Sequence, residues 1–124
     1  MKMVLMIAGG GALGSVARYL VSSWVYQWLG RQFPWGTLVV NVGGSFLMGF
    51  LLHFLSEHLP VSPEWRAAAL VGFLGGLTTF STFSSETLEL LKNGFVTSAL
   101  LNALVSVTLC VGAVWVGLWV SRSI

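Results

Sequence analysis

Four long apolar stretches with few charged residues occupy most of this chain and limit what it can fold into. They cover approximately residues 3–28, 36–55, 65–91 and 95–120. Only 8% of the 124 residues are charged, whereas a typical soluble domain has about 25%. A helix needs about 20 apolar residues to cross the hydrocarbon core. The sequence therefore predicts an all-α integral membrane protein, a single domain of four transmembrane helices in a lipid bilayer.

The first stretch resembles a signal peptide, because Lys2 precedes an apolar run that is rich in small residues. We interpret it instead as an uncleaved first span, since apolar residues continue past Arg18 and further spans follow. Gly10 and Gly14 form a pair of small residues four apart, which lets another helix approach closely.

Several function classes are disfavoured by the composition. The six basic residues are scattered singly, so there is no patch for nucleic acid. Cys110 has no cysteine partner, which rules out an intrachain disulfide. His53, Glu57 and His58 could suggest a metal site, but a solvated cluster at the membrane interface is favoured. No span holds the paired acids or the nucleophile and base of an enzyme.

The third stretch contains the segment Gly75–Ser85, which reads GGLTTFSTFSS. Paired glycines followed by six hydroxyl residues form poor helix, so we expect a break there. Non-helical backbone at membrane depth survives only where protein buries it or where it lines a wet cavity, which indicates an ion or substrate site. The alternative is that the hydroxyls bond back to their own helix while Phe80 and Phe83 face lipid.

Three polar side chains inside or near the spans each leave two interpretations open. Arg18 either extends to the interface or faces a water-filled vestibule that gathers anions. Asn41 either bonds a neighbouring helix or faces a cavity. Glu86 either lines a pore mouth or is solvated at a helix end. A weakly polar stripe with a period of four residues follows on the last span, at Asn102, Ser106 and Cys110.

The basic residues are balanced between the two faces that four spans would create. One face has three and the other has two, or three if Arg18 emerges there: Lys2, Arg66 and Arg122 against Arg31 and Lys92. Because the difference in Lys and Arg sets orientation, we expect the chain to insert both ways up. With small-residue seams on three spans, it is a candidate for an antiparallel homodimer.

Two segments closely resemble those of the small fluoride channels called Fluc or CrcB. They are GTLVVN (Gly36–Asn41) and GGLTTFSTFS (Gly75–Ser84), and Arg18 and the four-span length agree. The resemblance implies a dual-topology, antiparallel homodimer with two pores. It also implies a central structural sodium ion, held by the backbone carbonyls of Gly75 and Thr78 from each subunit.

The same resemblance implies a fluoride path and a role. The path would include Asn41, Phe80, Ser81 and Phe83, continued by Thr37 and Ser106, with Arg18 in the vestibule. The roles of Asn102 and Cys110 stay open, because neither is a hydroxyl. The implied activity is passive, fluoride-selective export from the cytoplasm across the inner membrane of a prokaryote, without an energy source.

Two other functions were weighed against this one. A small multidrug transporter is also a short four-span protein, but it needs a membrane-embedded carboxylate, and every acid here is expected in or near a connection. A noncatalytic assembly subunit would need only glycine-rich seams and short loops, and it leaves the Gly75–Ser85 segment unexplained.

Overall fold

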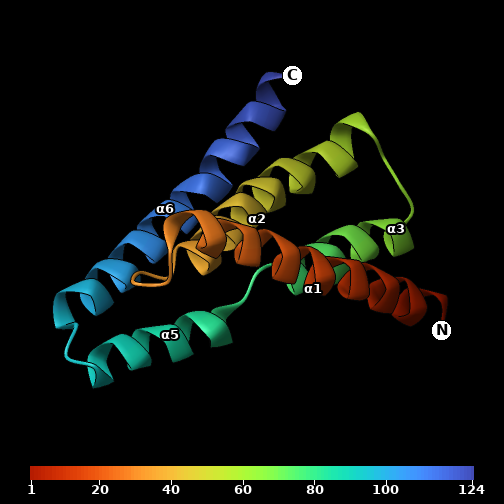
Figure 1. Ribbon diagram of the computed structural model, residues 1–124. Helices are drawn as coiled ribbons and strands as arrows, with labels where there is room; N and C mark the ends of the chain where they lie inside the picture. The colour runs from red at the N-terminus through yellow and green to blue at the C-terminus, as the bar shows by residue number, and fades with distance from the viewer.

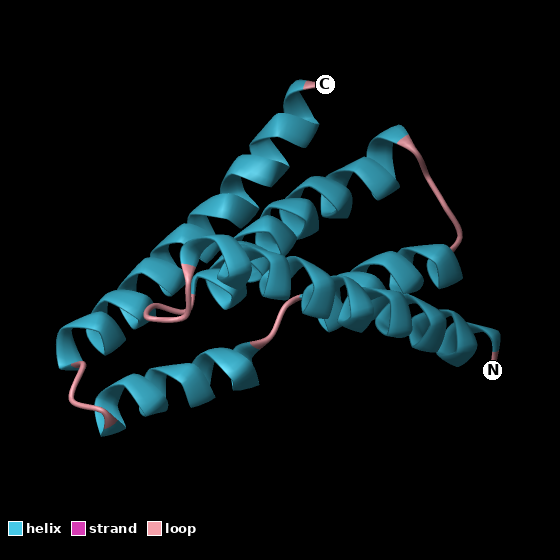
Figure 2. Cartoon of the chain, in the orientation of Figure 1, coloured by secondary structure: helices cyan, strands magenta, loops and turns pink.

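The computed structural model describes residues 1–124 as helices joined by short connections, with no strand (Figures 1 and 2). Four helical segments are each long and apolar enough to cross a membrane: Lys2–Leu29, Trp35–His58, Pro63–Lys92 and Val96–Ser123. The third of them is interrupted. The predicted fold class, an all-α membrane protein with four spans and a broken third helix, is confirmed.

The first two spans are bounded by residues suited to helix ends. Helix α1 (Lys2–Leu29) ends at Gly30, whose φ of +79° lies in the left-handed region that glycine adopts readily. Pro34 precedes α2 (Trp35–His53). A π-helical turn, η1 (Phe54–His58), continues α2. The second span therefore extends beyond Leu55, where the sequence had placed its end.

The third span begins with Ser62, whose hydroxyl accepts a hydrogen bond from the Trp65 backbone N–H and caps α3 (Pro63–Ala67). The helix continues through the π-helical turn η2 (Ala68–Phe73) into α4 (Leu74–Leu77). After two extended residues, α5 (Phe80–Lys92) begins. Gly94, with a φ of +85°, then leads to α6 (Val96–Ser123).

The break itself is shorter than predicted. Only Thr78 and Thr79 are extended, while Gly75 and Gly76 belong to α4 and Phe80–Ser85 belongs to α5. The expectation that the paired glycines would be non-helical was wrong. A Cβ on Gly76 would lie 2.7 Å from the Gly11 carbonyl oxygen, so this glycine permits close helix packing within a regular helix.

The small-residue seams hold the spans of one chain together. A Cβ on Gly10 would lie 2.2 Å from the Ala68 carbonyl oxygen, so α1 and η2 touch backbone to backbone. On the other side of the bundle, a Cβ on Gly49 would lie 1.9 Å from the Val114 carbonyl oxygen of α6. These seams are occupied within the chain, and so they do not by themselves argue for a second copy.

The buried core is small and lies beside the first half of the third span. Its members are Val40, Leu70, Leu74 and Leu77. Helix α5, by contrast, has no buried residue and runs apart from the α1–α2 crossing, beside the first half of α6 (Figure 1). The third span thus has a packed half and an open half, joined at Thr78 and Thr79.

Candidate functional site

The Asn41 amide of α2 spans the break in the third helix. The Thr79 backbone N–H donates to Asn41 Oδ1 at 2.8 Å, and Asn41 Nδ2 donates to the Thr79 carbonyl at 2.9 Å. One side chain therefore satisfies both backbone groups of the extended residue. Buried backbone groups left unpaired in hydrocarbon cost free energy, so Asn41 stabilises the break.

The break leaves carbonyl groups unpaired at the end of α4 and provides the residue that caps the start of α5. The Thr79 hydroxyl accepts a hydrogen bond from the Thr82 N–H at 3.2 Å, which starts α5. No donor of the chain reaches the carbonyls of Gly75 and Thr78, because the Thr79 and Thr82 N–H groups are engaged elsewhere. These free carbonyls lie at the negative end of a helical segment.

A cavity of about 320 Å³, the ring cavity, lies where α2, the break, α5 and α6 meet. It is lined in part by four of the predicted path residues, together with the thiol left open above: Asn41, Phe80, Phe83, Ser106 and Cys110. The two phenylalanine rings are tilted with centroids 5.3 Å apart. The Phe80 side chain is 76% exposed, so its edge and face are available to whatever fills the cavity.

Ser81 and Thr37 lie outside the ring cavity. Ser81 is exposed, and its hydroxyl lies 3.3 Å from that of Thr79. Thr37 is buried at 4% exposure and lines a second cavity of about 240 Å³, the hydroxyl cavity. The structure therefore brings four of the six predicted path residues to the ring cavity. The other two, Ser81 and Thr37, do not line it.

The hydroxyl cavity also contains the Arg18 side chain, which is half-buried. Most of its lining residues have polar side chains, Ser15, Ser22, Thr79 and Thr82 among them. The structure places Arg18 beside this cavity near the break, and its role in a vestibule stays a prediction.

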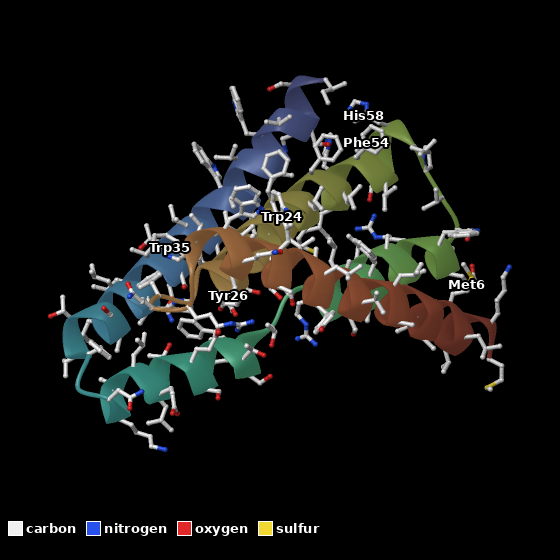
Figure 3. The ribbon with its side chains drawn as sticks, viewed as in Figure 1. Met6, Trp24, Tyr26, Trp35, Phe54 and His58 are labelled. Carbon is white, nitrogen blue, oxygen red and sulfur yellow. The ribbon has the colours of Figure 1, made fainter.

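Sequence reasoning missed a cluster of Tyr26, Thr37 and Glu86. The Tyr26 hydroxyl donates to Glu86 Oε2 at 2.5 Å, and the Thr37 hydroxyl donates to Glu86 Oε1 at 2.5 Å. Figure 3 shows Tyr26 between the end of α1 and α5. The view of Glu86 as a solvated helix end was wrong, because its carboxylate is held by two other helices. A carboxylate inside the predicted limits of a span was the signal, since such a group needs partners.

A second polar chain links α5 to α6. The Asn102 amide, 2% exposed, donates to the Thr87 hydroxyl at 2.9 Å. The Ser106 hydroxyl donates to Asn102 Oδ1 at 3.3 Å. Thr87 in turn donates to the Phe83 carbonyl at 2.7 Å. Asn102 thus connects Ser106 to the helix that carries the phenylalanine rings.

His53 is the last residue of α2, and His58 lies near the C-terminus of α6 (Figure 3). His53 Nδ1 lies 3.0 Å from the Ser121 hydroxyl, and His58 Nε2 donates to the Ser121 carbonyl at 3.0 Å. Ser121 is fully buried. The histidines tie the ends of two helices together at a distance from the break.

Fold and site define a small multi-pass membrane protein whose interrupted helix borders polar and aromatic cavities. The chain belongs to the family described as CrcB-like protein, Camphor Resistance (CrcB), which its residues 5–118 match.

The chain is also similar to curated relatives that carry the name fluoride-specific ion channel FluC. It is 57% identical to the protein of Methylococcus capsulatus over 94% of this chain and 51% of that protein, so the chain spans about half of that relative's length. It is 55% identical to the protein of Magnetococcus marinus over 95% of this chain and 96% of that one. It is 48% identical to the protein of Geobacter metallireducens over 98% of both chains.

Proposed function

We propose that this protein is a fluoride-selective channel that exports fluoride passively from the cytoplasm. The observation that carries the proposal is the ring cavity at the break, where an amide, two aromatic rings and a hydroxyl lie together. The names of the relatives, which share about half of its residues, support it. The family consists of ion channels, and the protein is not an enzyme.

The cavity offers groups that can replace the water around a small anion. Asn41 uses one amide proton on Thr79, which leaves the second free. The edges of the Phe80 and Phe83 rings carry partial positive charge and can attract an anion. A narrow bore lined by such groups favours fluoride over the larger chloride. We include Ser106, Ser81 and Thr37 as further hydroxyls along the path.

The proposed assembly is an antiparallel homodimer with two pores. Helix α5 supports it, because this helix has no buried residue and its Ser81, Thr82 and Ser85 side chains are exposed. Hydroxyls facing hydrocarbon would be unfavourable, so a second copy that covers them stabilises the helix. The small-residue seams do not add support, because the chain fills several of them itself.

A structural sodium ion would fit the free carbonyls of Gly75 and Thr78. Carbonyl oxygens suit hard cations, and these two lie at a helix end without a hydrogen-bond donor from the chain. Two carbonyls are too few to enclose a cation, which fits a site completed by the second copy. The ion would fix the two breaks against each other and take no part in moving the anion.

Passive export requires only a selective path and the membrane potential. Hydrogen fluoride crosses the bilayer as a neutral acid and ionises in the more alkaline cytoplasm. An inside-negative potential then expels the anion through the channel, with about 2.3 kcal/mol available per charge at 100 mV. We place the protein in the inner membrane of a prokaryote, as the bacterial relatives suggest.

The direct test is ion release from liposomes that contain the purified protein and are loaded with fluoride or with chloride. An ion-selective electrode should record electrogenic fluoride release on addition of a potassium ionophore, with negligible chloride release. Equal rates for the two halides would contradict the proposal. Proton-coupled ethidium efflux would instead favour a multidrug transporter.

A further inference from the structure

The Tyr26, Thr37 and Glu86 cluster lies between two polar cavities. On one side, a cavity of about 220 Å³, the connection cavity, is lined by Tyr26, Arg31, Glu86 and Glu89 and lies beside the first and third connections. On the other side is the hydroxyl cavity, with Arg18 and Thr37. Each of these cavities holds one arginine, and the cluster joins their walls because Thr37 and Tyr26 both bond Glu86.

Glu86 is held by hydroxyls and not by an arginine. Both carboxylate oxygens accept hydrogen bonds at 2.5 Å, one from Tyr26 and one from Thr37. The Arg31 guanidinium lies over the Tyr26 ring, 4.6 Å from its centroid. Tyr26 therefore contacts Glu86 through its hydroxyl and Arg31 through its ring. Glu86 therefore leaves Arg18 and Arg31 without a carboxylate partner.

The Tyr26 ring packs closely against the start of α2. A Cβ on Gly36 would lie 2.5 Å from Tyr26 Cε2, so the ring rests directly on the α2 backbone. The Thr37 N–H donates to the phenol oxygen at 3.4 Å. The contacts with α2 thus fix the position of the Tyr26 hydroxyl independently of its hydrogen bond to Glu86 of α5.

We propose that Tyr26 is a positioning residue that holds the Glu86 carboxylate on hydroxyl donors and away from Arg31, which lines the same cavity. This inference rests on the proposed fluoride conduction. An arginine that pairs with a carboxylate loses most of its attraction for free anions, and charge-lined cavities raise the local concentration of a counter-ion 10-fold or more. Without the phenol, Glu86 keeps only the Thr37 hydroxyl as a donor and is free to pair with Arg31, which lines the connection cavity with it.

The experiment compares Tyr26→Phe in two backgrounds, native and Glu86→Gln, by fluoride efflux from liposomes over a range of fluoride concentrations. In the native background, efflux at low fluoride should fall on the order of 10-fold, and the loss should shrink as fluoride approaches saturation. In the Glu86→Gln background, the same change should alter efflux less than about twofold, because no carboxylate remains to neutralise an arginine.

Tyr19→Phe is the matched control, since Tyr19 is the other tyrosine of the chain and lines the hydroxyl cavity beside Arg18 without bonding Glu86. Whatever its effect, the size should be the same in both backgrounds. The proposal is overturned if Tyr26→Phe matches the native protein at all concentrations, if its loss is equal in both backgrounds, or if Tyr19→Phe shows the same dependence on Glu86. A native protein that moves no fluoride would overturn the proposed function as well.

Discussion

The two halves of the third span differ in what holds them. The first half, Pro63–Leu77, rests on α1 through glycine, with a Cβ on Gly72 falling 2.6 Å from the Ile7 carbonyl oxygen. The second half, α5, has no buried residue and is connected to its neighbours mainly by polar side chains. One half is therefore fixed by backbone contact within the chain, while the other presents rings and hydroxyls. This division separates the structural part of the helix from the part available to an ion.

The strongest way to break the packed half is to enlarge Gly10. In Gly10→Leu, the new Cβ would meet the Ala68 carbonyl at 2.2 Å, and neither backbone can yield easily. We expect a loss of about 3 kcal/mol or more in the free energy of unfolding, measured by loss of helical circular dichroism in sodium dodecyl sulfate. Gly9→Leu is the control, because nothing lies within 4 Å of its Cβ position. Equal losses in both variants would contradict the close contact.

Replacing Asn41 tests the joint between the halves. Asn41→Leu leaves the Thr79 N–H and carbonyl without partners, and we expect a loss of about 2 kcal/mol in unfolding free energy. Hydrogen exchange should accelerate across residues 75–85 while α1 stays protected. Asn102→Leu removes a buried amide elsewhere and should leave exchange at the break unchanged. Unchanged protection at Thr79 in Asn41→Leu would show that the amide does not hold the break.

Changing a ring in the open half should separate transport from stability. Phe80 is 76% exposed within the chain, so Phe80→Ile should alter unfolding free energy by less than about 0.5 kcal/mol. Fluoride efflux should nevertheless be suppressed, because an aliphatic side chain has no positive edge. Phe83→Ile should behave similarly, and its elution volume in size-exclusion chromatography should match that of the native protein. Full fluoride efflux from both variants would show that the two rings do not line the fluoride path.

The smallest effect is expected at Ser84. Its hydroxyl donates to the Phe80 carbonyl at 2.9 Å, within its own helix and exposed. Ser84→Ala should change stability by less than about 0.5 kcal/mol and leave fluoride efflux unaltered. A large loss of efflux would show instead that this hydroxyl faces the anion, and the same efflux assay would detect it.

The fold class followed from the four long apolar stretches, because stretches of this length with so few charges leave few other solutions. The interruption of the third span was also predictable, although its extent was not. Gly75 and Gly76 are helical, and Gly76 packs closely against the α1 backbone from within that helix. The hydroxyls beyond Phe80 are helical because Thr79 caps the new helix. Propensity indicated a weak point, and tertiary contacts confined it to two residues.

The candidate site was predictable only where residues lie near the break. Asn41 stood out as a lone amide in an apolar span, and both interpretations hold, since it bonds the neighbouring helix and lines the ring cavity. The pairing of Tyr26 with Glu86 was not predictable, because the residues are 60 positions apart. How the helices rotate about their axes decides such contacts, and periodicity does not fix that rotation.

The pair of hydrogen bonds between the Asn41 side chain and the Thr79 backbone has a mechanical consequence. The Asn41 amide bonds the N–H and the carbonyl of one extended residue, as a neighbouring strand does in a sheet. The bend in the third span is therefore held by a side chain of α2. The two hydrogen bonds therefore let α2 set the angle at which α4 and α5 meet.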